Sequence, residues 1–454
     1  MKKLGVWILL LGGISVYLVS CKTSTPPETE VVEVNSSAPD WILQGNVYEV
    51  NVRQYTPEGT FRAFAKNLDR LKEMGVQTVW FMPINPISTV DRKGSLGSYY
   101  AVSDYTAVNP EFGTIDDFKA VVKAIHDKDM KVLIDWVPNH TGGNHRWMSS
   151  HPDFFVKDST GKPAVAFDWA DVRQLDYKNM EMQDSMISSM KWWVNETGID
   201  GFRVDVAWNV PASFWQKCIP QIKAMGDKFM LAEGDSAYLP KSGFDAVYPW
   251  HMFKMMCKVA NGERPAFALD SVKAESDLMY PAETIQLYFT SNHDENSWNQ
   301  SDFGKFPGAV HAPFAVFTQT MANSVPLVYS GQEEPVLRAL KFFDKDPIVF
   351  GKYERAKFYT TLQNLRKNNA ALSADAGFRK IAAGDSTAVY AYVREKGAQK
   401  VLVVLNLSAK EQSISVKDAS LAGEPLNVFG GSKEAVLNKE WMIEPWGYAV
   451  YEYR

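Results

Sequence analysis

Length, composition and charge already exclude several classes of protein for this chain. Its 454 residues suffice for two or three folded units, and 46% hydrophobic with 22% charged residues matches a soluble globular enzyme with a large core. The net charge of −5 provides no basic field that would attract nucleic acid, so no nucleic-acid partner is expected.

The first twenty residues have the pattern of a secretory signal peptide. A charged MKK start precedes an apolar stretch over 4–19, which is too short and wrongly flanked for a membrane-spanning helix. The segment closes with LVSC, which resembles the bacterial lipoprotein signal, where cleavage precedes the cysteine and the cysteine takes lipid chains. We expect residues 1–20 to be removed and Cys21 to hold the protein at the periplasmic or cell-surface face of a membrane, with plain secretion as the alternative.

Residues 21–40 are predicted to be the lipidated cysteine and a flexible tether. The segment is rich in Thr, Ser, Pro and Glu and has few large apolar side chains, so burial cannot offset the entropy of ordering it. Beyond Cys21 the chain has only Cys218 and Cys257, which make at most one bridge. We expect both to be buried, structural thiols.

From residue 41 to 371, short β-branched and aromatic runs alternate with longer amphipathic stretches. This alternation predicts a parallel sheet with crossover helices. Eight candidate strands begin near Val47, Val76, Lys131, Gly201, Phe229, Asp245, Ile285 and Val325. Eight strands of this kind predict a closed (β/α)₈ barrel, a TIM barrel of the α/β class, as the catalytic unit.

Helical patterns lie between these runs, at 60–74, 115–128 and 211–225, the last starting with a proline that a first helical turn tolerates. Two connections are longer than a strand-helix unit needs, at 83–113 and at about 138–178. We expect both to overhang the C-terminal face of the barrel, and the second to form a short inserted domain after the third strand.

The helical period disappears after residue 371, and alternating runs such as AVYAYVRE, KVLVVLNLS and WGYAVYEY follow. Alternation with a period of two is typical of antiparallel strands with one buried face. We expect residues 372–454 to form a small β-sandwich-like domain with no obvious catalytic cluster.

Polar residues finish several predicted strands, at the face where barrel enzymes carry out catalysis. The fourth run contains Arg203 and Asp205, the fifth reaches Glu233, and the seventh reaches Asp294. The spacing of the three acids corresponds to about one and two strand-helix units at roughly 30 residues each. Convergence of the acids on one rim is therefore expected.

Two carboxyl groups about 5–5.5 Å apart are what glycosidase chemistry with retained configuration needs. One attacks the anomeric carbon and the other, protonated, donates to the leaving oxygen; Asp205 and Glu233 can fill these roles. Arg203 lies two residues before Asp205 and points to the same face of the strand, so its fixed charge would keep Asp205 ionised.

Four ordered motifs resemble those of the α-amylase family of glycoside hydrolases: DWVPNH at 135–140, GFRVD at 201–205, AEG at 232–234 and SNHD at 291–294. The segment from GSYYAVSDY to NPEFGT, 97–114, also resembles the family's loop after its second strand. The resemblance covers roughly residues 45–450. It implies a retaining hydrolase that cleaves α-1,4-glucosidic bonds in starch, maltodextrins or related α-glucans, with such a glucan as its partner and no required cofactor.

Position by position, the resemblance implies Asp205 as nucleophile, Glu233 as general acid/base, and Asp294 as the third acid that grips the distorted sugar. The residues that it implies at the same subsite are Tyr100, His140, Arg203 and His293. Asp135 is interpreted as ordering the first motif through hydrogen bonds and not as touching substrate.

The family commonly binds a structural calcium through the Asn of the first motif, here Asn139. This chain departs from the family where many amylases have Lys-His shortly after the nucleophile, because it has Trp208 and Asn209 there. Both a usual substrate contact and a usual calcium ligand are changed, so the resemblance leaves a structural calcium open.

Other aromatic and histidine residues have a structural interpretation beside a functional one. Two roles stay open for four tryptophans, which either stack against a sugar or are buried under a loop: Trp147, Trp169, Trp250 and Trp298. His145 and His151 lack the spacing of a zinc site, and a solvated loop is expected there.

Alternatives to an α-amylase-like hydrolase stay open. Within the enzymes these are an α-glucan transglycosylase, a cyclomaltodextrinase and an α-glucosidase. Outside the enzymes, the predicted anchor and the Trp208-Asn209 departure are consistent with a surface glucan-binding protein, against which the three intact acids argue.

Overall fold

A computed structural model describes residues 38–454. The predicted signal segment, Cys21 and most of the predicted tether lie outside the described residues. Among the residues that are described, no helix is long and apolar enough to cross a membrane.

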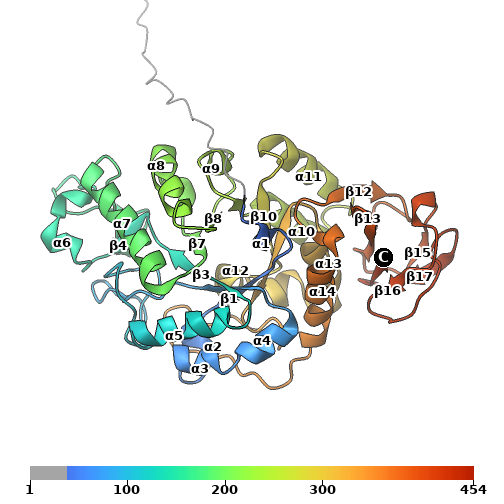
Figure 1. The fold of residues 1–454 in the computed structure, drawn as a ribbon, viewed down its shortest axis with the longest axis horizontal. Coiled ribbons are helices and arrows are strands. Elements are labelled where there is room, and N and C mark those ends of the chain that lie inside the picture. The colour runs from blue at the N-terminus through green and yellow to red at the C-terminus, as the bar shows by residue number, and fades with distance from the viewer. Residues whose placement is uncertain (1–37) are drawn as a thin grey trace, which may run out of the picture.

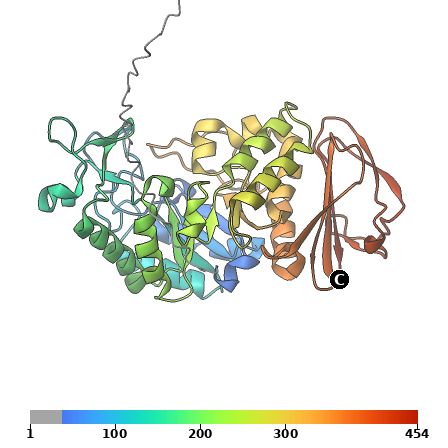
Figure 2. The same ribbon diagram turned by 90° about the horizontal axis from the view of Figure 1, so that it is seen from above.

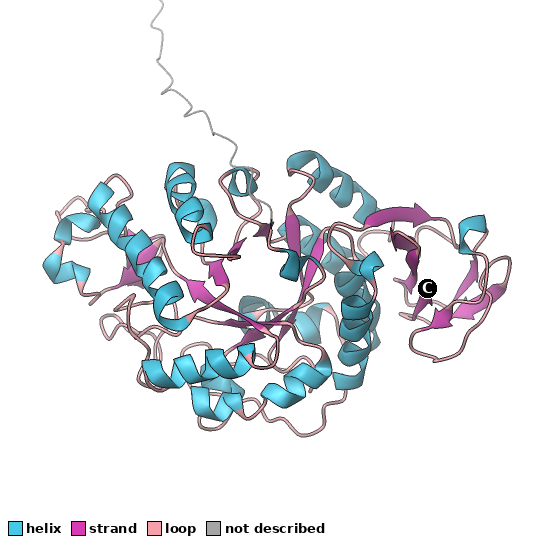
Figure 3. Cartoon of the chain, viewed as in Figure 1, coloured by secondary structure: helices cyan, strands magenta, loops and turns pink. Residues whose placement is uncertain are grey.

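Eight parallel strands form the closed barrel that the sequence predicts (Figure 1). In their order around the barrel they are β1 (Val47–Val50), β2 (Thr78–Phe81), β3 (Lys131–Trp136), β7 (Gly201–Val204), β8 (Phe229–Ala232), β9 (Ala246–Val247), β10 (Ile285–Tyr288) and β11 (Ser324–Tyr329), and β11 pairs with β1. Apart from Lys131, every residue of these strands is buried. Helices lie around the outside of the barrel (Figure 3), and side chains fill the inside of such barrels. The predicted fold is confirmed.

Charged residues inside such strands need partners, because an unpaired buried charge is costly. Glu49 in β1, Asp135 in β3 and Arg203 in β7 are fully buried charged residues of the barrel strands. They lie toward the C-terminal ends of these strands, so the barrel itself brings ionisable groups to one face.

Helices surround the barrel. They are α1 (Asp40–Leu43), α2 (Val52–Tyr55), α3 (Phe61–Ala65), α4 (Leu68–Met74), α5 (Ile115–His126), α7 (Met180–Thr197), α8 (Ala212–Lys223), α9 (Tyr238–Lys241), α10 (Trp250–Ala260), α11 (Ala268–Met279), α12 (His293–Asn299), α13 (His311–Thr320) and α14 (Ala356–Asn368). The helix predicted over 60–74 is two helices, α3 and α4, because the Asn67 side chain at their junction donates to the carbonyls of Ala63 and Phe64. Pro211 precedes α8 in an extended conformation and is not its first residue.

The long connection after β3 forms a small subdomain beside the barrel, at the left of Figure 2. It contains β4 (His140–Gly142), α6 (Trp147–Ser150), η1 (Pro152–Phe154), β5 (Val165–Ala166) and β6 (Trp169–Gln174), with the strands in the order β4-β6-β5. Two ion pairs, Lys93 with Asp171 at 2.9 Å and Asp91 with Arg173 at 2.6 Å, join it to the connection after β2. The two long connections that were predicted to overhang the barrel therefore bind each other through these ion pairs.

The C-terminal part is antiparallel, as predicted, and lies at the opposite end of the molecule in Figure 2. A five-stranded sheet has the order β12 (Gly377–Ile381), β13 (Val389–Lys396), β14 (Gln399–Asn406), β18 (Tyr448–Tyr453) and β16 (Leu426–Asn427); β15 (Gln412–Ser415) pairs with β17 (Glu440–Ile443). Buried Arg394 joins this sheet to the barrel by donating to the carbonyls of Thr320, Met321 and Ser373.

Candidate active site

A pocket of about 670 Å³ opens at the C-terminal ends of the barrel strands. Six of the seven residues predicted as catalytic or substrate-binding line it: Tyr100, His140, Asp205, Glu233, His293 and Asp294. The seventh, Arg203, lies fully buried beneath the pocket and contacts two of the acids. The structure therefore brings the predicted set together from four strand ends and the connection after β2.

Arg203 binds three carboxylates at once. Its Nη1 donates to Asp135 Oδ1 at 2.9 Å and to Asp205 Oδ1 at 3.0 Å. Its Nη2 lies 3.0 Å from Glu233 Oε1, an ion pair without the alignment of a hydrogen bond, and its Nε donates to the Tyr248 hydroxyl at 3.1 Å. One cation thus fixes the positions of the predicted nucleophile and the predicted acid relative to each other.

The protonation of Asp205 is linked to that of Glu233, because each carboxylate acts on the pKa of the other. Burial and the Glu233 carboxylate raise the pKa of Asp205 well above its usual value, against the opposing effect of Arg203. Burial would also raise the pKa of Glu233, but Arg203 and the Val206 N–H, which donates to Oε2 at 2.8 Å, hold it below its usual value. In the ligand-free arrangement these shifts favour an ionised Glu233 over an ionised Asp205, which is opposite to the prediction that Arg203 keeps Asp205 ionised.

The backbone after the nucleophile adopts an unusual conformation to make this contact. Val206 has φ 44° and ψ 38°, in the left-handed region that β-branched residues avoid. This turn directs the Val206 N–H at Glu233 and starts the short helix η2 (Ala207–Asn209), which carries Trp208 to the pocket rim. Backbone strain of this kind is concentrated at functional sites.

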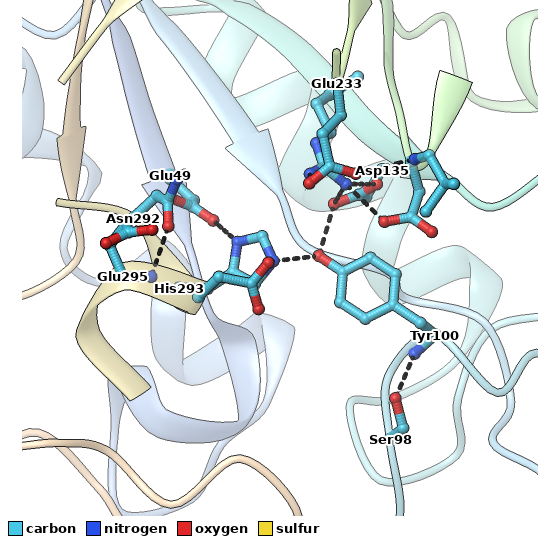
Figure 4. A network of polar contacts seen from close by, with 12 residues as sticks. Glu49, Ser98, Tyr100, Asp135, Glu233, Asn292, His293 and Glu295 are labelled. Atoms are coloured by element: carbon cyan, nitrogen blue, oxygen red, sulfur yellow. Dashed lines mark hydrogen bonds and ion pairs between the residues drawn. The ribbon is translucent and has the colours of Figure 1, made fainter. Parts of the chain in front are cut away.

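His293 is a cation near neutral pH. Its Nδ1 lies 2.5 Å from Glu49 Oε1, and its Nε2 lies 2.8 Å from the Tyr100 hydroxyl (Figure 4). The same Nε2 lies 3.5 Å from Asp294 Oδ2. Burial alone would lower the pKa of His293, but Asp294 and Glu49 raise it to about 9. The protonated ring can therefore donate from both nitrogens.

Tyr100 connects His293 to the Arg203 cluster. Its hydroxyl donates to Asp135 Oδ2 at 3.0 Å, and its ring stacks on the His293 ring with centroids 5.5 Å apart. Burial raises the pKa of Asp135 to about 6, against the opposing charge of Arg203. Asp135 is fully buried and lies outside the pocket lining. Its side chain accepts hydrogen bonds from Arg203 and Tyr100, which are not part of the first motif that it was predicted to order.

The surroundings of Asn139 do not fit a calcium ion. Its Oδ1 accepts from the side-chain amides of Asn209 at 2.9 Å and Gln174 at 3.1 Å, and its Nδ2 donates to His140 Nδ1 at 3.0 Å. Hydrogen-bond donors thus surround the oxygen that a cation would need. Within residues 38–454, no group of three or more His, Cys, Asp and Glu side chains could hold a metal ion.

His140, adjacent to Asn139, is neutral near pH 7, because burial lowers its pKa to about 4. The hydrogen bond from Asn139 to Nδ1 places its proton on Nε2. His140 is thus an uncharged polar group in the pocket lining, unlike His293.

The tryptophans divide between the two interpretations left open by the sequence. Trp169, Trp250 and Trp298 line the pocket. Trp147 is buried instead and packs on Tyr105 and Phe154 in the inserted subdomain, so its role is structural.

The expectation of a solvated loop is wrong for His145. The residue is only 1% exposed, its ring contacts the rings of Tyr105 and Trp147, and burial lowers its pKa to about 3. The cause is the aromatic core of the inserted subdomain, which the spacing of the histidines does not reveal. Cys218 and Cys257 are free and buried, as expected.

Several pocket residues were not identified from the sequence. Trp208 was noted only as a departure, and Lys93, Asp171, Phe342 and Phe343 also line the pocket. Glu49 lies beneath them as the partner of His293. A charged residue within the apolar run VYEV was a signal for Glu49, whereas no local pattern indicates which loops meet over the pocket.

Known proteins are similar to the chain along most of its length. Two family models match it, the catalytic domain of α-amylase over residues 22–170 and the C-terminal domain of maltogenic amylase over residues 378–450. An α-amylase of Haloarcula japonica is 25% identical and aligns with 84% of this chain and 58% of its own length; a Bacillus cyclomaltodextrinase is 26% identical over 77% and 65%. The chain thus spans less than two thirds of these two relatives.

Solved structures of α-amylases are also similar to this chain, and the similarity covers a larger share of both chains. A noncanonic maltogenic α-amylase from Thermotoga neapolitana has a TM-score of 0.82 at 28% identity and covers 91% of this chain and 99% of its own. An α-amylase from Lactobacillus plantarum has a TM-score of 0.81 at 26% identity, over 91% and 100%. With the barrel, the motifs and the assembled site, these similarities show that the chain belongs to the α-amylase family.

Proposed function

We propose that the protein hydrolyses α-1,4-glucosidic bonds of starch, maltodextrins or related α-glucans with retention of configuration. The observation that supports this most strongly is the joint binding of Asp205 and Glu233 by Arg203 at the floor of a pocket that also contains Asp294. A double displacement needs two carboxyl groups close together in one pocket, one as nucleophile and one as acid/base. The α-glucan specificity follows from the family and from relatives that are named α-amylase and cyclomaltodextrinase.

In this mechanism Asp205 attacks the anomeric carbon while Glu233 protonates the leaving oxygen, and Glu233 then takes a proton from the attacking water. In the ligand-free site the shifts run the other way, because the pKa of Asp205 is raised and that of Glu233 is lowered. The reaction therefore needs the proton on Glu233 and an ionised Asp205 once substrate is bound. We propose that a bound sugar reverses the two shifts by separating Glu233 from Arg203, whose charge lowers the pKa of Glu233.

The cationic His293 and the third acid, Asp294, are proposed to bind hydroxyl groups of the same sugar, with Tyr100 packing on one face of its ring. Each of these side chains lines the pocket, and Glu49 and Asp135 hold His293 and Tyr100 in place. Hydrogen bonds from charged groups are stronger than neutral ones, which suits recognition of sugar hydroxyls in a partly buried site.

The reaction proposed here needs no cofactor. The family includes members with a structural calcium, but here the amides of Asn209 and Gln174 bind the Asn139 oxygen where such an ion would be held. We propose that these hydrogen bonds replace the ion in joining the inserted subdomain to the barrel.

We propose further that the enzyme acts outside the cytoplasmic membrane, anchored by lipid at Cys21. The support is the MKK start, the short apolar stretch and the LVSC sequence. Cell fractionation tests it: the full-length chain is expected in the membrane fraction and the Cys21→Ala chain in the soluble fraction. Equal distribution of the two chains would contradict the anchor.

Activity is tested with a chain that starts near Lys22, incubated with soluble starch and with maltoheptaose while reducing ends are counted. Asp205→Asn and Glu233→Gln serve as variants that keep the size of each side chain. Cleavage by the wild type that falls by several orders of magnitude in both variants is expected. If the wild type cleaves no α-glucan, the hydrolase is refuted and a glucan-binding protein takes its place.

A further inference from the structure

An ion pair between two long connections lies at one edge of the pocket. Lys93 Nζ is 2.9 Å from Asp171 Oδ1, which joins the connection after β2 to strand β6 of the inserted subdomain. Both residues line the pocket. The side chain of Asp171 is only 4% exposed, whereas that of Lys93 is 38% exposed. Because a buried carboxylate needs a partner, Lys93 is held against Asp171 at this edge.

The same connection is also fastened to the loop that follows β11. The Ser95 N–H and hydroxyl both donate to Asp344 Oδ1, at 2.8 and 2.6 Å, and the Leu96 N–H donates to the Phe343 carbonyl at 2.9 Å. Gly94 has φ 60°, and a Cβ atom there would lie 2.5 Å from the Phe343 Cβ, so this close approach requires glycine. The connection after β2 is therefore bound on two sides.

Aromatic rings continue this line of contacts to helix α12. Lys93 Nζ lies 5.9 Å from the centre of the Phe343 ring. The rings of Phe342 and Phe343 contact each other, and both contact the Trp298 ring, with centroids 5.4 and 5.8 Å away. The result is a continuous row of five residues that all line the pocket, and we call it the pocket wall: Asp171, Lys93, Phe343, Phe342 and Trp298.

The pocket wall lies on the side of the barrel opposite Glu233. Its members come from the connections after β2, β3, β10 and β11, which are the two nearest strands on either side of β1. Glu233 follows β8, which is four strands away from β1 in both directions around the barrel. The proposed function, on which this step rests, assigns Glu233 to protonate the leaving oxygen, so the leaving part of the glucan extends on the Glu233 side. The part that becomes bound to Asp205 then extends toward the pocket wall.

The part of the glucan on the side of the pocket wall carries the non-reducing end, because each unit of an α-1,4-glucan is linked from its C1 to O4 of the next unit. Cleavage inside a long chain needs room for many further units on this side. The pocket wall begins close to the reacting sugar, since the Phe342 ring stacks on the Tyr100 ring with centroids 6.2 Å apart. The pocket volume of about 670 Å³ is also that of a site for a small ligand.

We propose that the pocket wall makes the enzyme exo-acting, so that it admits the non-reducing end of a glucan and releases products of one or two glucosyl units. The free 4-hydroxyl of the terminal unit meets Lys93 and Asp171, which can donate a hydrogen bond to it and accept one from it. Starch is then shortened from its ends, and a chain whose end is blocked on this side is a poor substrate.

The test compares 4-nitrophenyl α-maltoheptaoside with the same compound blocked at its non-reducing end by a 4,6-O-ethylidene group. Nitrophenyl-labelled products are separated by chromatography, and kcat/KM is measured for each substrate. In the wild type the block is expected to lower kcat/KM by about tenfold to 100-fold, since a closed pocket discriminates against added carbon atoms. The first labelled products of the free substrate are expected to be one or two glucosyl units shorter than the substrate.

Two variants open the pocket wall. Lys93→Ala removes the ammonium group, and Lys93→Ala combined with Asp171→Asn removes both charges, so that no buried carboxylate loses its partner if the first variant fails to fold. In each, the discrimination against the blocked substrate is expected to fall by about tenfold, and labelled products of many lengths are expected to appear.

Asp91→Asn is the matched control. Asp91 pairs with Arg173 at 2.6 Å between the same two segments, but neither residue lines the pocket. This variant is expected to discriminate against the blocked substrate as strongly as the wild type does. Loss of the discrimination in Asp91→Asn would show that the joining of the two segments matters and not the closure of the pocket, and would overturn the proposal.

The proposal is also overturned if an active wild type cleaves both substrates equally well, or if the two open variants discriminate as the wild type does. Failure of the proposed function is a separate result, namely an inactive wild type. Binding of free and blocked maltoheptaose, followed by tryptophan fluorescence, then decides the role of the pocket wall. Binding of the blocked sugar that is about tenfold weaker in the wild type but not in Lys93→Ala supports it. Equal binding of the two sugars by the wild type, or no binding, refutes it.

Discussion

Replacement of Glu49 by Gln is expected to move the alkaline limit of activity to lower pH. Glu49 Oε1 lies 2.5 Å from His293 Nδ1, and with Asp294 it raises the pKa of His293 from its ordinary value of 6.5 to about 9. An opposite charge in direct contact shifts a pKa by about 1–3 units, so the loss of the Glu49 charge is expected to shift the limit by about 1–2 pH units. Each unit corresponds to about 1.4 kcal/mol of interaction between the two side chains.

The same shift affects stability with a definite sign. The pKa of His293 is higher in the folded protein than in the unfolded chain, so protonation of this ring stabilises the fold. This stabilisation is complete below pH 6.5 and is lost as the pH rises through about 9. The assay measures kcat and KM from pH 5 to 10, together with urea unfolding at each pH. In Glu49→Gln both the fall in activity and the fall in stability are expected to begin nearer neutral pH.

Glu333→Gln is the matched control for a general loss of stability. Glu333 is another fully buried carboxylate close after a barrel strand, where it binds Tyr48 and Arg70 instead of His293. This variant is expected to be less stable while its activity keeps the alkaline limit of the wild type. An unchanged limit in Glu49→Gln, or an equal shift in both variants, would refute a direct action of Glu49 on His293.

Three further predictions concern other parts of the chain. Arg203→Met leaves three buried carboxylates without their cation, and urea unfolding is expected to show that the free energy of unfolding falls by about 3–5 kcal/mol. A fall below about 1 kcal/mol, as for a surface ion pair, would contradict the central role of Arg203 in holding the three carboxylates. Because donors surround the Asn139 oxygen, EDTA is expected to leave activity and Tm unchanged, and a lower Tm that calcium restores would show a bound ion. In a chain that starts near Lys22, Cys218 and Cys257 are expected to react with a thiol reagent only after unfolding, since burial raises both pKa values to about 12; rapid reaction of the native protein would contradict this.

Much of the barrel could be predicted from sequence because its strands are buried on both faces. Such strands are continuous apolar runs, and their few charged residues then mark the catalytic face. The helix at 60–74 was predicted less well, because one side-chain interaction at Asn67 ends α3 without interrupting the apolar periodicity.

The candidate site was predictable where a residue lies within a motif on a strand end. Contacts between loops were not predictable, because sequence spacing does not indicate which loop tips meet. The ion pair of Lys93 with Asp171 and the contact of Phe167 with Trp208 both join segments far apart in the chain. His145 shows the converse error, since a polar residue in a long connection became part of a buried aromatic core.

The anomeric configuration of the first product tests the central claim most directly. Maltoheptaose is cleaved in an NMR tube by the chain that starts near Lys22, and the anomeric proton signals are followed before mutarotation. A double displacement on Asp205 with Glu233 as acid predicts α-anomeric products first, with no product from Asp205→Asn. Products that appear first as β-anomers, or undiminished cleavage by Asp205→Asn, would contradict the account.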